Sequence, residues 1–335
     1  MSAPPPPSTG VLRVLARRGA FYALAGWVAI TLNFLIPRLM PGDPAAALFA
    51  RLQGQLQPEA MAALRLTLGL SDAPLWRQYL DYIGNLAQGE LGRSVAFYPA
   101  PVTEIIGSGL LWTSFLAGGA LIISFTLGAG LGALAAWRRG GWLDQLGPPL
   151  LSLIGAFPYF WVAMAAAWLL GFQAGWFPLR HAWDPGLSPS LSWTFIESVI
   201  SHAVLPASTL VIASLGGWAL GMRNTTIAVL GEDYIQYARA RGLSPGRVFV
   251  HHALRNAALP NLTGFGMALG FVLSGALLTE IVFAYPGQGY LLITAVRAQD
   301  HPLMQGLFLT ITLAVLGANF TVDALTALLD PRVRR

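Results

Sequence analysis

Arginine and histidine side chains are concentrated in one polar stretch, residues 231–260, of a chain that is otherwise mostly apolar. Arginine stays protonated in proteins and presents a planar fork of N–H donors, so a group of arginines is suited to docking against a partner. The basic residues in or beside this stretch are Arg223, Arg239, Arg241, Arg247, Arg255, His251 and His252. On a helix, adjacent histidines point about 100° apart and do not chelate a metal as an i, i+4 pair does. The stretch therefore predicts a docking surface, and we expect no metal site.

Titratable residues, among them Glu280, His202 and Asp323, also lie in apolar stretches, where a charge is costly and often functional. Glu280 lines a substrate path in one interpretation, and in the other it caps a helix or pairs with Arg297. His202 comes one turn before Pro206, so its ring either bonds a backbone carbonyl that the proline frees or relays protons. The structural interpretation is favoured for both and for Asp323. Glu280 and His202 are kept as candidate residues of a transport pathway.

Two alternatives of a different class are an intramembrane enzyme and an autonomous channel or carrier. A serine protease needs a serine beside a histidine, and Ser274 and His202 are available, but no Gly-x-Ser-Gly motif is present. Such an enzyme would also leave the arginine-rich stretch without a purpose. An ion-coupled carrier is disfavoured because few charges lie in the apolar stretches.

Two amino acids are missing from the sequence. There is no cysteine, and all 20 basic residues are arginine, so there is no lysine. A Walker A loop needs a lysine at the phosphates, and Schiff-base catalysis needs one as well. We therefore expect no cofactor on this chain, with any ATP and Mg²⁺ bound by a partner subunit. The net charge of +5 comes from arginines in short loops between apolar stretches, which indicates membrane topology and not nucleic-acid binding.

Two short helices that meet at Gly242 are predicted for the polar stretch. The first covers about Asp233–Arg241, and its apolar and aromatic face is formed by Tyr234, Tyr237 and Ala238. Gly242 supplies the backbone freedom that a sharp break requires. Ser244 then serves as an N-cap before Pro245 at the first helical position. The second helix presents Val248, Phe249, His252 and Leu254. This amphipathic pair suits docking against another protein.

Six apolar stretches are long enough to cross a bilayer, which takes about 20 residues. With 55% hydrophobic and 10% charged residues, the chain is more apolar than a soluble domain. The stretches are residues 19–39, 109–137, 146–172, 196–222, 258–284 and 303–329. The second is rich in glycine, which lets helix backbones approach closely, and Pro148, Pro149 and Pro158 are expected to break or kink the third. The predicted fold class is an all-α polytopic membrane protein with six transmembrane helices and an extracytoplasmic helical insertion after the first.

Arginine placement orients these helices, because cytoplasmic loops are enriched in arginine. Most arginines lie near the two termini, at residues 138–139 and in the polar stretch, so these parts are expected to be cytoplasmic. The predicted organisation is a disordered cytoplasmic N-terminus at 1–18, a first transmembrane helix at 19–39, an extracytoplasmic helical insertion at 40–107, a five-helix core at 108–330 with its cytoplasmic loop at 223–257, and a cytoplasmic tail at 331–335.

The polar stretch resembles the cytoplasmic coupling loop, or EAA motif, of binding-protein-dependent ABC importer permeases. The runs ARARGLS at 238–244 and HALRNAALP at 252–260 are similar to the dipeptide/oligopeptide/nickel permease branch, although only Ala238, Gly242 and Leu254 match the general motif. Further resemblances are MPGDP, ALRLTLGL, PLWRQYLDYI, GELGRS and PVTEII, all before residue 107. The resemblance covers about residues 13–335.

This resemblance implies a transport subunit and not an enzyme. The implied partners are a second homologous permease, two ATP-binding cassette ATPases that hydrolyse the ATP, and an extracytoplasmic binding protein. The complex would lie in the bacterial inner or plasma membrane, with both termini cytoplasmic, and would import oligopeptides or dipeptides, or alternatively an oligosaccharide or a nickel chelate. The residues implied to couple to the ATPase are Tyr234, Tyr237, Ala238, Arg239, Arg241, Gly242, Arg247 and Leu254.

Overall fold

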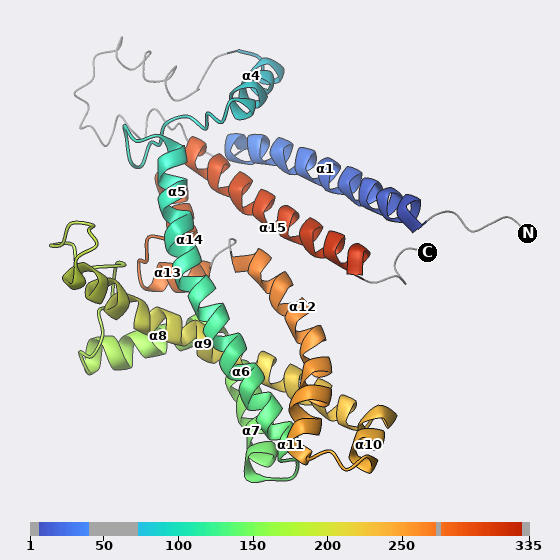
Figure 1. Cartoon of the computed structure of the whole chain (residues 1–335). Coiled ribbons are helices and arrows are strands. Elements are labelled where there is room, and N and C mark those ends of the chain that lie inside the picture. Colours follow the sequence, from blue (N-terminus) through green and yellow to red (C-terminus); the bar gives the residue numbers. More distant parts are fainter. Residues whose placement is uncertain (1–6, 40–72, 273–275, 330–335) are drawn as a thin grey trace, which may run out of the picture. The chain divides into compact units, whose positions relative to one another are not determined.

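The computed structural model describes residues 7–39, 73–272 and 276–329, and the regular structure of these parts is helical apart from one bridge between Arg93 and Pro101 (Figure 1). The predictions for residues 1–6, for the first half of the insertion, for Ser274 and for the tail at 331–335 lie outside these ranges, whereas residues 7–18, predicted as part of a disordered N-terminus, are helical. The chain forms two compact units. The terminal unit comprises Met1–Thr113, Leu273–Leu277 and Pro286–Arg335, and the central unit comprises Ser114–Val272 and Leu278–Tyr285.

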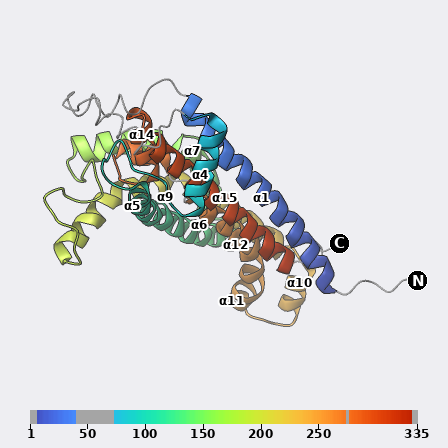
Figure 2. The ribbon, with the colours of Figure 1, turned by 90° about the horizontal axis from the view of Figure 1, so that it is seen from above.

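Two long helices, α1 (Pro7–Leu39) and α15 (His301–Leu329), run side by side in the terminal unit (Figures 1 and 2). Asp323 of α15 forms an ion pair with Arg18 and accepts a hydrogen bond from the Tyr22 hydroxyl at 2.9 Å. The half-buried carboxylate of Asp323 therefore holds the helix pair together. This agrees with the structural interpretation of Asp323.

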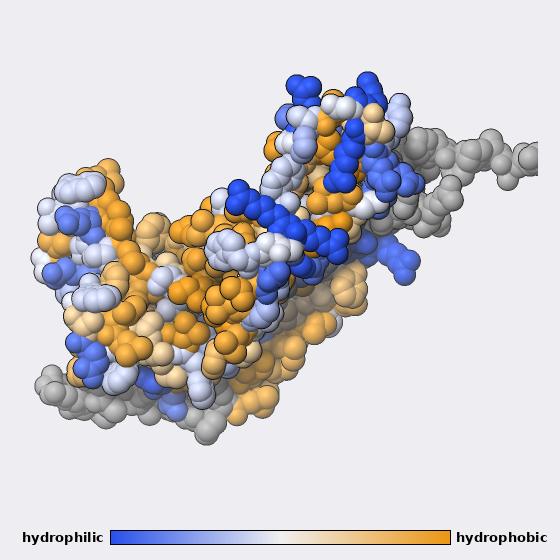
Figure 3. Space-filling model, turned by 90° about the horizontal axis from the view of Figure 1, so that it is seen from below, coloured by the Kyte–Doolittle hydropathy of each residue, from blue (hydrophilic) through white to orange (hydrophobic). Residues whose placement is uncertain are grey.

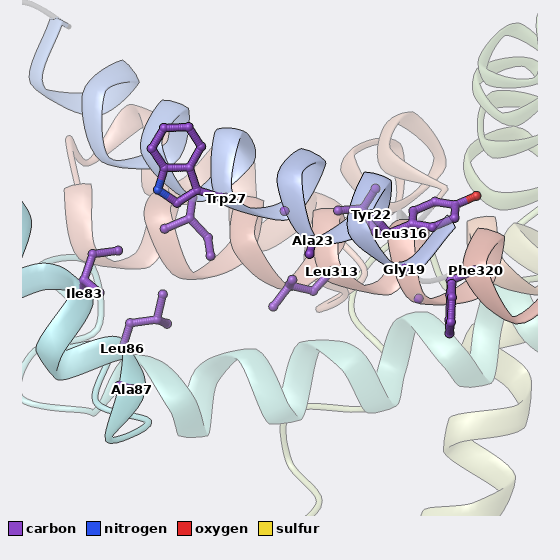
Figure 4. A pocket seen from close by; sticks show the side chains of 13 residues that line it. Gly19, Tyr22, Ala23, Trp27, Ile83, Leu86, Ala87, Leu313, Leu316 and Phe320 are labelled. Carbon is purple, nitrogen blue, oxygen red and sulfur yellow. The ribbon is translucent and has the colours of Figure 1, made fainter. Parts of the chain in front are cut away.

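The amphipathic helix α4 (Leu75–Ala87) packs beside α1. The hydroxyls of Tyr79 and Thr31 lie 2.8 Å apart, which ties the two helices together. Between α1, α4 and α15 lies an apolar cavity of about 750 Å³. Its lining includes Trp27 of α1, Leu86 of α4 and Leu313 of α15 (Figure 4).

The core of the terminal unit forms where α5 (Val102–Thr113) and α14 (Gln288–Arg297) meet α15. Its buried residues are Val102, Ile106, Leu291, Ala295, Leu303, Met304 and Leu307. Asp300 is buried just before α15 and accepts hydrogen bonds from the Ser94 hydroxyl, from Ala96 N at 2.8 Å and from Leu303 N at 3.0 Å. It therefore caps α15 and fastens the connection that precedes α5.

In the central unit, α6 (Gly119–Trp137) packs closely along α9 (Trp193–Leu230). Gly128 and Gly132 are buried where the two backbones approach, as expected of small residues in a membrane helix. A Cβ at Gly128 would lie 2.9 Å from the carbonyl oxygen of Leu215. A turn of π-helix, η1 (Ser114–Gly118), precedes α6 and continues from α5, so one helix runs through Val102–Trp137.

The third apolar stretch is bent, as Pro158 predicts. Helix α7 (Trp142–Gly155) and the helix formed by α8 (Tyr159–Ala166) and η2 (Ala167–Gln173) meet at 88°. Pro148 and Pro149 lie inside α7 and do not interrupt it. Pro158 precedes the first residue of α8, a position where the missing N–H costs nothing.

Helix α9 extends further than the sequence predicts, because Arg223 does not end the apolar helix at Met222. The helix continues to Leu230, and Arg223 is accommodated by an ion pair with Asp144. Beyond it come α10 (Asp233–Ala240), α11 (Pro245–Arg247), the π-helical η3 (Val248–Leu254), α12 (Arg255–Val272) and α13 (Leu277–Val282).

Among the described residues, four helices are long and apolar enough to cross a membrane, or up to five when the bent pair is counted as one span. Many large apolar side chains are exposed on them, for example Leu127, Trp161 and Leu262. In the space-filling view much of the visible surface is hydrophobic, and hydrophilic residues gather in separate groups (Figure 3). The chain is thus an all-α multi-pass membrane protein, and the expectation of six spans stays a prediction.

Candidate coupling surface

The arginine-rich stretch folds around a small apolar core of its own. Ile235 and Ala238 of α10 are buried against Val248 and Ala253 of η3. The predicted apolar and aromatic face of α10 is therefore divided: Ala238 faces inward, whereas Tyr237 is 67% exposed. Ile235 and Ala238, spaced i, i+3, form the inward face. Tyr234 and Tyr237 each come one residue before them and are therefore turned outward.

Gly242 ends α10 in the conformation that the hinge prediction requires, with φ of +74°. Gly242 N donates to the carbonyl oxygen of Arg239 at 2.9 Å, and Leu243 N donates to that of Ala238 at 3.4 Å. These two bonds form a Schellman motif, in which glycine is favoured because a left-handed φ strains other residues. The angle between α10 and the following helix is thus fixed by backbone geometry.

After the hinge, Pro245 occupies the start of α11, as predicted, and Ser244 stands at the N-cap position, although its side chain makes no capping hydrogen bond. The chain then remains helical through η3 into α12, so the second coupling helix continues directly into a long apolar helix. Leu254 is half-buried and packs on Ala133 of α6 and Met222 of α9. Leu254 is therefore an anchor of the surface and not an exposed contact residue.

The outward side of the helix pair is cationic and aromatic. Arg239, Arg241 and Arg247 are exposed, and within the described residues none of them forms an ion pair. The guanidinium of Arg241 lies 5.9 Å from the centroid of the Tyr237 ring. Because the three charges are solvated and uncompensated, they are available to carboxylates of a partner.

Tyr234 joins the two helices through Asn256, which was not predicted as a site residue. Asn256 Nδ2 donates to the Tyr234 hydroxyl at 2.8 Å and to the carbonyl oxygen of His252 at 3.0 Å. Asn256 carries no distinguishing sequence pattern, since its partner lies in another helix. Tyr234 is 41% exposed, so it both braces the pair and contributes to the surface.

The helix pair rests on the end of α6. The rings of Phe249 and Trp137 meet edge to face with centroids 4.3 Å apart. Beside them lies a cavity of about 330 Å³, also lined by Arg239, Pro245 and Leu230. Trp137 was not predicted as a site residue, and only its position at the end of an apolar stretch pointed to it.

A second connection joins α7 to α9 near this surface. Arg223 Nε lies 2.6 Å from Asp144 Oδ1, and Asp144 also accepts a bond from Gly140 N at 2.9 Å. The Asp144 side chain is only 8% exposed. Arg223, which borders the polar stretch in the sequence, is therefore a structural residue.

The two candidate pathway residues are in different surroundings. Glu280 is fully buried in α13. His202 Nδ1 lies 2.7 Å from the carbonyl oxygen of Ser198. This bond to a backbone carbonyl agrees with the structural interpretation of His202. The carbonyl that Pro206 frees is that of His202 itself, however, so the carbonyl bound here is a different one. Within the described residues, no group of three His, Asp or Glu side chains is arranged to hold a metal.

Long apolar helices joined through an exposed, cationic helix pair define a multi-pass membrane protein. The chain belongs to the family of binding-protein-dependent transport system inner membrane components, which matches residues 128–335. It is accordingly a permease subunit of a transport system and not an enzyme, which decides against the protease and autonomous-channel alternatives.

Curated relatives match the chain over nearly its whole length. The di/tripeptide transport system permease protein DppB of Pseudomonas aeruginosa is 37% identical over 97% of this chain and 99% of its own. The dipeptide transport system permease protein DppB of Alkalihalophilus pseudofirmus is 34% identical, over 93% and 95%. The probable D,D-dipeptide transport system permease protein DdpB of Escherichia coli is 35% identical over 95% of each chain.

Proposed function

We propose that this chain forms half of the translocation pathway of an ATP-driven importer of dipeptides and short oligopeptides. The substrate class is supported by the relatives, three of which are named for the transport of dipeptides or tripeptides. An oligosaccharide or a nickel chelate is the alternative cargo. The second half of the pathway is a homologous permease, and an extracytoplasmic binding protein delivers the substrate.

The chain crosses the inner membrane six times in this proposal. The bent pair α7 and α8 makes one span, and α12 with α13 makes another in addition to the four long helices. The positive-inside rule supports cytoplasmic termini, since Arg13, Arg17 and Arg18 lie near the beginning of α1 and further arginines follow α15 in the sequence. The same rule places α10 and α11 in the cytoplasm, and the connection between α1 and α5 on the opposite side.

The coupling mechanism follows from the helix pair. Two ATPase subunits bind ATP and Mg²⁺, and each receives one coupling loop in a surface groove, where Tyr237, Arg239, Arg241 and Arg247 contact it. Because the pair has its own buried core and rests on Trp137 through Phe249, displacement of the pair moves α6 and α9 with it. ATP-driven closure of the ATPases would thus rock the spans and alternate access across the membrane.

The observation that carries this proposal is the exposed, unpaired arginine surface on a rigid helix pair. Its test is retention of the ATPase subunits by tagged permease after Arg239→Glu together with Arg241→Glu. We expect the ATPases to be lost, because charge reversal opposes acidic partner groups. Arg138→Glu together with Arg139→Glu is the matched control, since these arginines are also exposed but lie outside the helix pair. Full retention by the first variant would contradict the docking role.

The substrate class is tested separately, by uptake into cells that lack other peptide importers. Labelled dialanine should accumulate only when the chain is present, and accumulation of nickel or of an oligosaccharide in its place would favour the alternative cargo. The binding protein should be required in either case.

A further inference from the structure

A polar cavity of about 540 Å³ lies in the terminal unit, and the coupling mechanism does not use it. Side chains of α1, α4 and α15 line it, together with the connection that precedes α5. The lining residues that matter are Arg38, Tyr82, Gln305 and Glu90. The volume falls in the range of small-ligand pockets, about 300–1,000 Å³.

Arg38 brings a positive charge to this cavity. Its guanidinium lies over the Phe34 ring at 3.7 Å and donates to the Phe34 carbonyl oxygen at 2.9 Å and to Gln78 Oε1 at 3.3 Å. Both acceptors are neutral, and no carboxylate of the described residues pairs with Arg38. A guanidinium has five N–H donors, so several remain for an anion.

Two neutral donors line the same cavity. The Tyr82 hydroxyl and the Gln305 amide nitrogen are inaccessible to solvent, and neither has a hydrogen-bond partner among the described residues. Burial raises the pKa of Tyr82, so the phenol stays protonated and can donate. A buried donor without an acceptor is costly, and a rotation of either side chain toward the cavity would let a ligand supply the missing acceptors.

We infer that this cavity binds a short peptide through its terminal carboxylate, which accepts hydrogen bonds from Arg38, Tyr82 and Gln305. The guanidinium fork matches a carboxylate. Glu90 also lines the cavity and is exposed, so it can receive the ammonium group of the same peptide. The choice of a peptide as the carboxylate ligand rests on the proposed function.

Equilibrium dialysis of the purified full-length chain with its co-purifying subunits, in lipid nanodiscs without ATP or binding protein, tests this site. The probes are radiolabelled dialanine and its C-terminal amide, which differs in the carboxylate alone. We expect the amide to bind at least about tenfold more weakly. Equal binding of the two probes, or binding of neither, would overturn the inference.

Substitutions then locate the site. Arg38→Gln should weaken dialanine binding about tenfold, and Tyr82→Phe, which removes a single oxygen, should weaken it a few-fold. Arg77→Gln is the matched control, because Arg77 is an exposed arginine of α4 outside the lining, and its affinity should equal that of the unaltered chain. Unchanged dialanine affinity in both Arg38→Gln and Tyr82→Phe would refute the assignment. If one variant folds poorly, unchanged affinity in the other would refute it.

The same variants separate this inference from its nearest alternative. If Arg38→Gln abolishes docking of the binding protein while the unaltered complex binds no dialanine, the cavity receives an acidic side chain of that protein and the inference is wrong. A failure of the proposed function looks different: the cell-uptake assay would report another cargo, whereas the dialysis measures peptide binding without transport.

Discussion

The guanidinium of Arg223 and the carboxylate of Asp144 lie 2.6 Å apart, and this pair fixes the beginning of α7 to α9. Arg223 is one turn beyond Ala219, whose backbone meets Gly132 of α6. Helices α6, α7 and α9, which lead toward the coupling surface, are therefore held together at this position. Under the proposed mechanism, displacement of the helix pair would therefore move α6, α7 and α9 together.

Replacing Asp144 by alanine should lower the free energy of unfolding by about 1–3 kcal/mol, because a mostly buried, charge-assisted hydrogen bond is lost. In a double-mutant cycle with Arg223→Ala, the two changes should be non-additive by about 1 kcal/mol. Thermal melts of the purified protein in detergent measure both. Additive effects would show that the two side chains act separately.

Gly132→Ala should destabilise the α6–α9 contact, because a Cβ there clashes with the carbonyl oxygen of Ala219 and lies 2.9 Å from Arg223 N. Backbone atoms cannot move aside as a flexible side chain does, so a loss of about 1–3 kcal/mol is expected. Gly130→Ala is the matched control on the same helix, with nothing within 4 Å of the added carbon. Equal melting temperatures of the two variants would contradict the close-packing interpretation.

Gly242→Ala should strain the hinge by about 1–2 kcal/mol, since alanine disfavours the left-handed φ of +74°. The space around Gly242 is open, so the effect is conformational and not steric. We expect fewer substrate molecules imported per ATP hydrolysed in reconstituted vesicles. Gly246→Ala, in the helical α11 with equally open surroundings, should leave this ratio unchanged. An unaltered ratio in Gly242→Ala would argue against a fixed hinge.

Glu280→Gln should reduce uptake without altering assembly if the carboxylate meets substrate during transport. The substitution keeps the size of a fully buried side chain while removing its charge and replacing one acceptor oxygen by an NH2 donor. Uptake is compared with the amount of permease–ATPase complex recovered from the same membranes. Loss of both together would assign Glu280 a structural role, as favoured from its sequence position.

The free energy of unfolding should depend on pH through the ionisation of Asp300. Burial raises the pKa of its carboxyl above the ordinary 3.8, against the hydrogen bonds from Ser94, Ala96 and Leu303 that favour the charged form. The folded state therefore holds the proton more tightly than the unfolded state. The stabilisation of the folded state by this tighter proton binding is present below about pH 4 and is lost as the pH rises through the raised pKa.

Thermal melts of the unaltered chain and of Asp300→Asn, between about pH 4 and pH 7, check this expectation. The difference in melting temperature between the two proteins should shrink, or reverse in favour of Asp300→Asn, as the pH rises, because asparagine is never charged. A difference that grows in favour of aspartate would show that the hydrogen bonds outweigh burial.

Local features of the sequence predicted the parts of the coupling surface that depend on the chain's nearest neighbours. Gly242 and the Ser244–Pro245 pair located the break and the second helix start, because φ preference and helix capping are properties of a few consecutive residues. Hydrophobic content and span length likewise determined an all-α membrane protein. The absence of lysine by itself predicted that any ATP is bound by a partner subunit, because a Walker A loop requires that residue.

Tertiary structure decided which side of each helix is used. Tyr237 and Ala238 share a predicted face, yet only Ala238 is buried, because the position of Val248 and Ala253 determines the inward direction. From sequence, Arg223 is expected to lie in a loop. In the folded chain it lies beside Asp144, which is 79 positions away in the sequence. Periodicity along one helix carries no information on the element that covers it, so contacts between distant segments had to come from the folded chain.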